Sequence, residues 1–249
     1  MINNLSNTAK DVAAKRRSIE LYGRGYSHHY RQSDDGESKT AYYLNLSDHL
    51  KSLSLSFGKQ IDVIDLGCGT GRYFHVLQNV NRLYGIDISE HMLAEARNPV
   101  LGTNTSAKEI VLIHGGVEKL DEFPERSVDL VYAIGILGNH CLLDVGLCNA
   151  VHRILHDGGV FYFSVPDADN RTLKPKTLKR RVMEGVYPML PTKAKKFLDE
   201  RWLDMSLSKK EIQLIADSSL FAGGLLIEAE LILPESWTLG RHWYCTLRK

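Results

Sequence analysis

The sequence predicts an α/β protein with a mostly parallel, doubly wound sheet covered by helices on both faces. Short apolar strands alternate with amphipathic helices from residue 60 onward, a pattern typical of this class. The first of these strands also runs directly into a glycine-rich turn. A chain of 249 residues that is 43% hydrophobic is long enough to bury both faces of such a sheet.

Composition disfavours several other classes of protein. The net charge of +1 provides no global field that would attract nucleic acid or a membrane. The four cysteines form no CxxC pair, so we expect neither a disulfide scaffold nor a metal site. No apolar run reaches the roughly 20 residues that a membrane-spanning helix needs, and the N-terminus lacks the apolar core of a signal peptide. We therefore expect a soluble, cytoplasmic protein.

Residues 1–57 are predicted to form an N-terminal helical cap. Segment 33–38 contains no apolar residue, which predicts a loop between two helical stretches. Tyr22, Tyr26 and Tyr30 recur at intervals of four and would share one face of a helix. Such an aromatic face belongs more often to a core than to a ligand site, and both interpretations stay open. Helices are expected within residues 11–31 and over 39–55.

The central part of the chain, residues 58–166, is predicted to contain five consecutive strands. Each is a short apolar run bounded by glycine or polar residues. Ser89 precedes an apolar helical pattern and is expected to cap a helix. The strands are expected at 61–66, 82–88, 109–115, 128–137 and 158–165, with further helices from about residue 70 and over 144–157.

A basic insertion, residues 167–206, separates the fifth strand from the rest of the sheet. Lysine and arginine outnumber acidic residues in it, and its prolines limit it to short helices. It follows the carboxyl end of a strand, where ligands of open α/β sheets bind, so we expect a lid. Residues 207–249 then complete a single domain of 1–249, with a helix over 208–220 and strands over 225–233 and 242–247.

The glycine-rich turn after the first strand is the strongest motif. Its glycines permit a tight turn and let a ligand approach the backbone. A helix after the turn would direct free N–H groups toward that ligand. Asp87 lies 20 positions beyond Gly67, at the end of the next strand, where a carboxylate can bond both hydroxyls of a ribose. The turn consists of Asp65, Leu66, Gly67, Cys68, Gly69, Thr70 and Gly71.

The same turn favours S-adenosylmethionine over a dinucleotide. A dinucleotide fingerprint requires a third glycine at the position of Arg72. The Asp65 carboxylate would repel a pyrophosphate, whereas the sulfonium and ammonium groups of S-adenosylmethionine are cationic. An NAD-dependent reductase and a glycine turn without a ligand are the alternatives.

These segments resemble the motifs of class I S-adenosylmethionine-dependent methyltransferases. The resemblance covers about residues 58–165 and implies a seven-stranded sheet with an antiparallel last strand, which suits HWYCTL (242–247) as an insertion at the edge. The matching segments are VIDLGCGTGRYF (63–74), GIDISEHMLAEAR (85–97), LVYAIGIL (130–137) and ILHDGGVFYFSVP (154–166).

The resemblance also implies roles for single residues. Asp87 would hold the ribose of the cofactor, whose demethylated product is S-adenosylhomocysteine. Family members often carry an acid where this chain has Gly116, so either Glu118 or backbone groups alone would bind the adenine amine. The implied cofactor contacts are Asp65, Gly67, Gly69, Gly71, Asp87, Ile88, Met92, Val117, Glu118 and Ala133, with Ile88 and Met92 beside the adenine and Ala133 beneath the methionine tail.

Histidines are the candidate bases. An oxygen or protonated nitrogen nucleophile must lose a proton, and imidazole titrates near neutrality. His140 follows the fourth strand, at the rim where an acceptor would meet the methyl group; a surface histidine capping the next helix is the alternative. His28 and His29 are the next candidates. They lie in the N-terminal segment, which folds over the cofactor in the family that this chain resembles.

A small molecule with an oxygen or nitrogen nucleophile is the expected methyl acceptor. The basic insertion could be a solvated lid, an electropositive mouth for a small acidic or phosphorylated substrate, or an RNA-binding surface. RNA is disfavoured by the near-neutral net charge and the few aromatic residues in the insertion. Methylation of tRNA or protein, and a cofactor-binding protein without transfer activity, are the alternatives.

Overall fold

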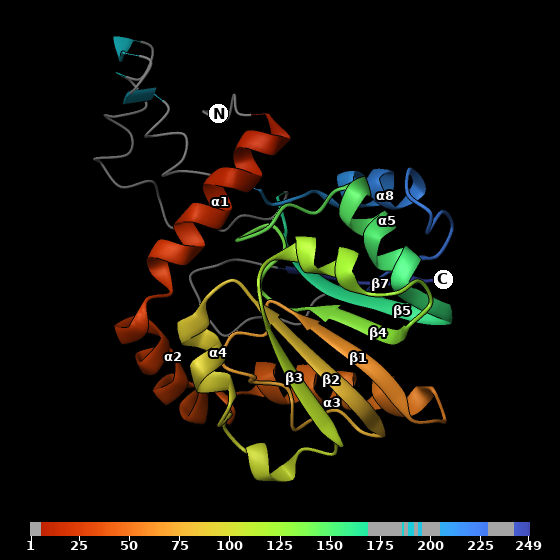
Figure 1. Ribbon diagram of the computed structural model, residues 1–249. Helices are drawn as coiled ribbons and strands as arrows, with labels where there is room; N and C mark the ends of the chain where they lie inside the picture. The colour runs from red at the N-terminus through yellow and green to blue at the C-terminus, as the bar shows by residue number, and fades with distance from the viewer. Residues whose placement is uncertain (1–5, 169–185, 187–188, 192–193, 196–204, 229–241) are drawn as a thin grey trace.

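The computed structural model describes residues 6–168, 186, 189–191, 194–195, 205–228 and 242–249. A seven-stranded sheet with the strand order β3-β2-β1-β4-β5-β7-β6 forms the centre of the protein (Figure 1). β7 is antiparallel to both of its neighbours, and the other strands are parallel to one another. The predicted fold class is confirmed, with β7 lying one strand in from the edge. The strands are β1 (Ile61–Leu66), β2 (Val80–Asp87), β3 (Glu109–His114), β4 (Val128–Ala133), β5 (Leu155–Pro166), β6 (Leu225–Glu228) and β7 (His242–Arg248).

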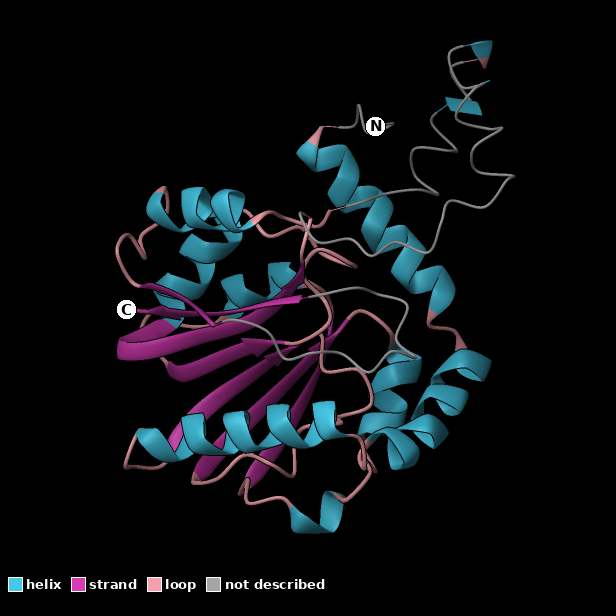
Figure 2. Cartoon of the chain, turned by 180° about the vertical axis from the view of Figure 1, so that it is seen from behind, coloured by secondary structure: helices cyan, strands magenta, loops and turns pink. Residues whose placement is uncertain are grey.

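Helices cover both faces of this sheet (Figure 2). α5 and α8 pack on one face, and α3 packs on the other, where Leu46 and Leu50 are fully buried against the sheet. The helices are α1 (Asn7–Leu21), α2 (Arg24–Glu37), α3 (Ala41–Ser56), α4 (Glu90–Ala96), α5 (Val145–Ile154) and α8 (Lys209–Asp217), with short 3₁₀ helices η1 (Gly102–Asn104) and η2 (Val117–Glu122).

Side-chain caps explain where several helices begin. Thr40, Ser89, Asp144 and Ser208 each accept a hydrogen bond from a backbone N–H of the first turn that follows. Ser208 and Glu211 complete a reciprocal capping box. Because these caps are local, the starts of α3, α4, α5 and α8 fall close to their predicted positions.

The loop predicted over 33–38 is wrong, because α2 continues through it to Glu37. Asp34 is buried there and accepts hydrogen bonds from Thr70 Oγ1 (2.5 Å) and Arg72 Nε (2.7 Å). Asp34 therefore forms a buried ion pair with Arg72, directly after the glycine-rich turn, a contact that no local pattern reveals.

The helix predicted from about residue 70 is also wrong. Gly69 and Gly71 have positive φ angles of 54° and 74°, which an α-helix does not contain. Successive turns follow, with Gly71 N bonded to Cys68 O and Phe74 N to Gly71 O. The chain after the turn therefore presents no helix N-terminus to a ligand.

α1 and α2 lie across the edge formed by the carboxyl ends of the parallel strands (Figure 1). Ser89 Oγ donates to Tyr22 O (2.7 Å), and the Arg31 guanidinium donates to Asn98 O, so both helices are tied to the α4 region. The proposed lid falls almost entirely outside the described residues, as do residues 229–233 of the predicted sixth strand. No helix in the described part of the chain is long and apolar enough to cross a membrane.

Candidate functional site

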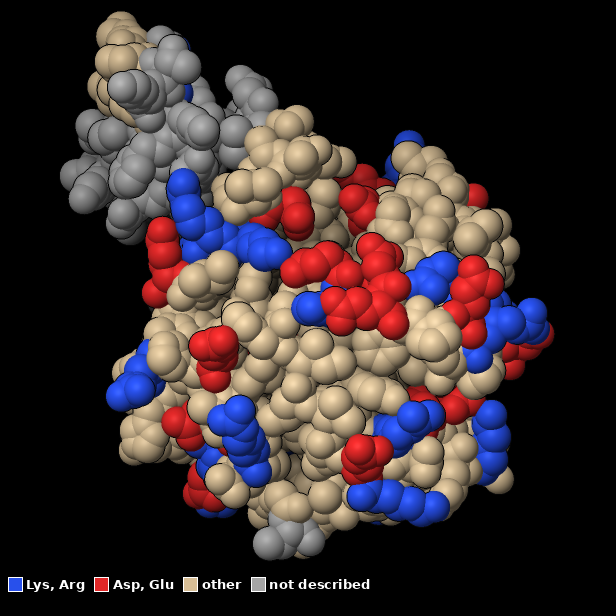
Figure 3. All heavy atoms as spheres, viewed as in Figure 1, with Lys and Arg blue, Asp and Glu red and all other residues tan. Residues whose placement is uncertain are grey.

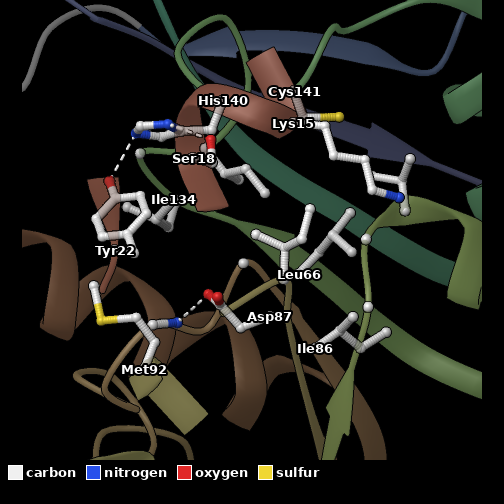
Figure 4. Close-up of a pocket in the computed structure, with 18 of the residues that line it drawn as sticks. Lys15, Ser18, Tyr22, Leu66, Ile86, Asp87, Met92, Ile134, His140 and Cys141 are labelled. Atoms are coloured by element: carbon white, nitrogen blue, oxygen red, sulfur yellow. Dashed lines mark hydrogen bonds between the residues drawn. The ribbon is translucent and has the colours of Figure 1, made fainter. Parts of the chain in front are cut away.

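The main pocket lies at the carboxyl ends of β1, β2 and β4, beneath α1 (Figure 4). Measured to its open mouth it holds about 900 Å³, within the range of small-molecule sites. A second hollow of about 550 Å³ adjoins it and shares five lining residues with it. The shared residues are Tyr30, Gly67, Gly69, Ile134 and Gly135, so one ligand can extend through both hollows.

Gly67 makes close approach to the backbone possible. Its φ angle is 79°, and an added Cβ would lie 2.5 Å from Ile136 Cδ1. Its N–H donates to Ile86 O (2.8 Å), which joins the turn to the end of β2. A side chain here would be strained and would clash with Ile136, which also lines the pocket.

Asp87 is held rigidly at the end of β2. One carboxylate oxygen accepts from Gly69 N and the other from Ser89 N, each at 2.8 Å. Burial raises the pKa of Asp87, while these two hydrogen bonds lower it. The carboxylate lines the pocket, so its remaining lone pairs are available to a ligand hydroxyl, as a ribose contact requires.

Asp65 lies in the second hollow at the end of β1. Burial raises its pKa to about 8, partly offset by a hydrogen bond from Tyr132 Oη (2.7 Å), and the nearby Asp87 raises it further. A buried carboxyl group of this kind gains a partner when a cation enters the hollow.

The other predicted cofactor contacts separate into two groups. Ile88, Met92, Val117 and Glu118 line the main pocket. Ala133 instead lies in the core with no exposed surface, and Ile134 and Gly135 take its place at the pocket wall. Gly71 does not line either hollow but packs against the Phe74 ring.

Glu118 faces the cap. Its Oε1 accepts from Gly116 N (2.9 Å) and from Lys15 Nζ (3.0 Å), the latter bridging η2 and α1. Burial raises the pKa of Glu118, but these hydrogen bonds and the Lys15 charge lower it more. The oxygen predicted for the adenine amine is thus already shared between two donors.

His140 lies at the end of the pocket opposite Asp87 and is bonded through both ring nitrogens (Figure 4). Ser18 Oγ lies 3.0 Å from Nδ1 and donates its own proton to Ala14 O (2.9 Å). Since the hydroxyl has one proton, it must accept from Nδ1–H. Nε2 is therefore the unprotonated nitrogen, and it accepts from Tyr22 Oη at 2.8 Å.

The His140 ring is neutral at physiological pH. Burial lowers its pKa to about 4, and the positive charge of Arg17 lowers it further. Arg17 is fixed nearby by donating to Asn139 O (2.5 Å). The pocket therefore holds a neutral imidazole with a basic nitrogen of defined orientation.

His28 and His29, the other candidate bases, do not line the pocket. The His28 side chain is 64% exposed and lies 3.4 Å from Glu95 Oε1 and 3.0 Å from Gln32 Nε2. His29 is exposed as well. Of the three candidate histidines, only His140 is placed where an acceptor could meet it.

One face of α1 contributes pocket residues that the sequence analysis did not assign. Ser18 and Tyr22 hold His140, and Lys15 holds Glu118. Their intervals of four, three and four identify one side of a helix, a signal present in the sequence but not specific to a site. The four residues are Asp11, Lys15 and Ser18 on α1 and Tyr22 at its C-cap.

Comparison with known families places this site in context. Residues 57–216 match the methyltransferase domain family. The chain belongs to the class I S-adenosylmethionine-dependent methyltransferases. The cofactor of that family is S-adenosylmethionine.

Curated relatives match parts of this methyltransferase chain. An uncharacterized protein of Methanocaldococcus jannaschii is 36% identical over 41% of the chain and 36% of its own length. A protein of Talaromyces variabilis named as an S-adenosyl-L-methionine-dependent Diels-Alderase is 26% identical over 56% of the chain and 49% of its own length. The chain thus spans about half or less of the length of these relatives.

Solved structures share the methyltransferase fold over nearly the whole chain. Magnesium protoporphyrin IX methyltransferase from Synechocystis PCC 6803, with bound S-adenosylhomocysteine, has a TM-score of 0.58 at 16% identity and covers 95% of this chain and 100% of its own. The plantazolicin methyltransferase, in complex with a desmethyl plantazolicin analogue and S-adenosylhomocysteine, has a TM-score of 0.57 at 14% identity and covers 96% of both chains.

Proposed function

We propose that this protein transfers the methyl group of S-adenosylmethionine to an oxygen or nitrogen of a small molecule. The observation that carries the proposal is the continuity of the two hollows with a neutral histidine at one end. Asp65 and Asp87 lie on the cofactor side, and His140 lies across the pocket from Asp87.

The residues fit the cofactor as follows. Asp87 would receive the two ribose hydroxyls, and Ile88, Met92 and Val117 would enclose the adenine. Asp65 would receive the ammonium of the methionine part in the second hollow. The bare backbone at Gly67 would let the cofactor cross from one hollow to the other.

When bound, the cofactor supplies an electrophilic methyl group on a sulfonium. The protein must align the acceptor with it, which can contribute roughly 7–11 kcal/mol. The acceptor would lose a proton as it takes up the methyl group, with S-adenosylhomocysteine as the other product, so the protein must provide a group that accepts this proton. We infer that this proton passes to Tyr22 Oη while the Tyr22 proton moves to His140 Nε2. A weak base suffices, because an oxygen that has gained a methyl group is much more acidic than the original hydroxyl.

Calorimetry with S-adenosylmethionine, S-adenosylhomocysteine and NADH tests the cofactor assignment. We expect the first two to bind and NADH not to bind. Asp87→Ala should weaken binding by about 1–3 kcal/mol, because ribose hydroxyls would be left without a buried partner. Asp35→Ala, which changes an exposed ion pair on α2, is the matched control. Unchanged affinity in a folded Asp87→Ala protein would contradict the ribose assignment.

A cofactor-binding protein without methyl transfer is the second candidate, favoured by the match to a protein named as a Diels-Alderase. The two candidates differ in whether the cofactor is consumed. Incubation with radiolabelled S-adenosylmethionine and a library of small hydroxyl and amine compounds should yield labelled product in the first case. Tight binding with no labelled product would favour the second.

A further inference from the structure

The charged side chains that line the pocket differ in whether they have a hydrogen-bond or ion-pair partner. Among the described residues that line the pocket, Asp11, Lys15, Asp87 and Glu118 carry formal charges, and His140 is neutral. Lys15 Nζ is paired with Glu118 Oε1 at 3.0 Å and extends away from His140 in Figure 4. Asp87 is bonded to Gly69 and Ser89 on the cofactor side.

Asp11 differs from the other three. Within the described part of the chain its carboxylate makes neither a hydrogen bond nor an ion pair. It lies one turn before Lys15 and two turns before Ser18 on the side of α1 that lines the pocket. Its charge reaches this space, because after burial it is the largest contribution raising the pKa of Cys141, which also lines the pocket.

Among the described residues, the pocket wall therefore offers a carboxylate without a partner, while its one lining cation, Lys15, is already paired. Arg17 lies near His140 but does not line the pocket, and it donates to Asn139 O. The aromatic ring of Tyr22 adds to this preference, since it lines the same pocket and ring faces attract cations. An anionic acceptor would meet Asp11 with like charge and would have to compete with Glu118 for Lys15.

We propose that the methyl acceptor is a small molecule that carries a cationic group, such as an ammonium, and that Asp11 binds this group while the nucleophile meets Tyr22 and His140. This inference rests on the proposed function and narrows its substrate class. It also opposes the acidic acceptor that the basic composition of residues 167–206 favours.

Cofactor-anchored probes test the proposal without knowledge of the natural acceptor. The probes are S-adenosylhomocysteine analogues in which nitrogen replaces sulfur and carries a short alkyl tether in place of the methyl group. The tether ends in an ammonium, a methyl or a carboxylate, and a series of tether lengths is made for each ending. Calorimetry measures the affinity of each probe relative to S-adenosylhomocysteine.

At the best tether length, the ammonium probe should bind the wild-type protein about tenfold more tightly than the methyl probe, as a charge-assisted hydrogen bond allows. The carboxylate probe should be the weakest. In Asp11→Asn the ammonium preference should disappear while the affinity for S-adenosylhomocysteine is kept. Lys15→Met, which removes the cation from the same helix face, should keep the ammonium preference.

Equal binding of the three probe classes by the wild-type protein would overturn the proposal, as would an ammonium preference that persists in Asp11→Asn. A protein that fails to bind S-adenosylhomocysteine would overturn the proposed function itself, and this inference with it. Binding of S-adenosylhomocysteine with no charge preference among the probes would leave the proposed function intact.

Discussion

At the scale of single residues, we expect Asp65 to link cofactor binding to the release of a proton. Its pKa of about 8 means that the carboxyl group is mostly protonated at neutral pH. A cationic ammonium favours the ionised form, so binding should release a proton below pH 8. Affinity for S-adenosylmethionine should therefore rise by up to tenfold per pH unit toward pH 8 and then level off. Calorimetry at pH 7 in buffers of different ionisation enthalpy measures the proton directly.

Asp65→Asn provides the control for this prediction. The folded state raises the pKa of Asp65, so this residue favours folding most at low pH, and its contribution is lost as pH rises from about 4 toward 8. The ligand-free variant should therefore gain stability relative to wild type across that range, and its cofactor affinity should be weaker and independent of this proton. Binding without proton release in the wild type would contradict the assignment.

His140 should affect turnover more than binding. His140→Ala and His140→Gln should each lower kcat by about 10²-fold, because neither variant can accept the proton. Cofactor affinity should hardly change, since the loss falls on the transition state. With a pKa of about 4, His140 should keep kcat constant well below pH 6.5, with the acidic decline nearer pH 4. Full activity in both variants would leave alignment alone as the mechanism.

Some of these residues could be identified from the sequence and others could not. Asp87 and Gly67 belong to a motif whose spacing is fixed by one strand, one turn and the next strand, so local order is enough to place them. Ser18 and Tyr22 reach His140 from more than 100 positions away in the chain. Such contacts depend on how α1 packs over the sheet, which no short spacing encodes.

At the scale of secondary structure elements, α2 is held to the glycine-rich turn by the buried pair between Asp34 and Arg72. Asp34 is only 1% exposed, and it also receives Thr70 from that turn. The Arg72 guanidinium also lies 4.7 Å from the centre of the Tyr30 ring. Arg72 thus replaces the third glycine of a dinucleotide motif with a contact that fixes the cap.

Breaking this pair should loosen the cap. Asp34→Ala leaves a buried guanidinium without its carboxylate, which typically destabilises a protein by about 3–5 kcal/mol. Urea unfolding measures the loss, and hydrogen exchange should accelerate in α2 before it does in the sheet. Asp35→Ala, at the neighbouring exposed position, should change stability little. Equal effects of the two substitutions would mean that the buried pair does not anchor α2.

The strands were easier to predict than the N-terminal cap, because a buried strand leaves a local apolar pattern whereas α2 depends on tertiary contacts. β1 and β4 are almost entirely buried and appear as short, mostly apolar runs such as IDVIDL. α2 is polar along most of its length and is stabilised by contacts to α4 and the glycine-rich turn, such as Arg31 to Asn98 O. Its composition therefore resembles that of a loop, and its helical state depends on tertiary contacts.

At the scale of the whole molecule, charge argues against nucleic acid as the acceptor. Figure 3 shows basic side chains standing singly or in small groups on this face, with acidic ones gathered between the positions of α1 and α5. The net charge of the chain is +1. A surface of this kind offers no continuous track for a phosphate backbone on the face shown.

We therefore expect bulk tRNA to bind weakly and with little dependence on salt. Each phosphate that a protein neutralises releases counterions and makes the slope of log affinity against log salt concentration more negative by about 0.7–0.9. The lysines and arginines on the face shown are scattered and would contact few phosphates at once, and the net charge is +1, so the slope should stay near zero in titrations followed by fluorescence anisotropy. The measurement should use the full chain with S-adenosylhomocysteine bound, so that residues 167–206 are included. A steep slope equivalent to several phosphates would contradict the prediction and would make tRNA methylation the leading alternative.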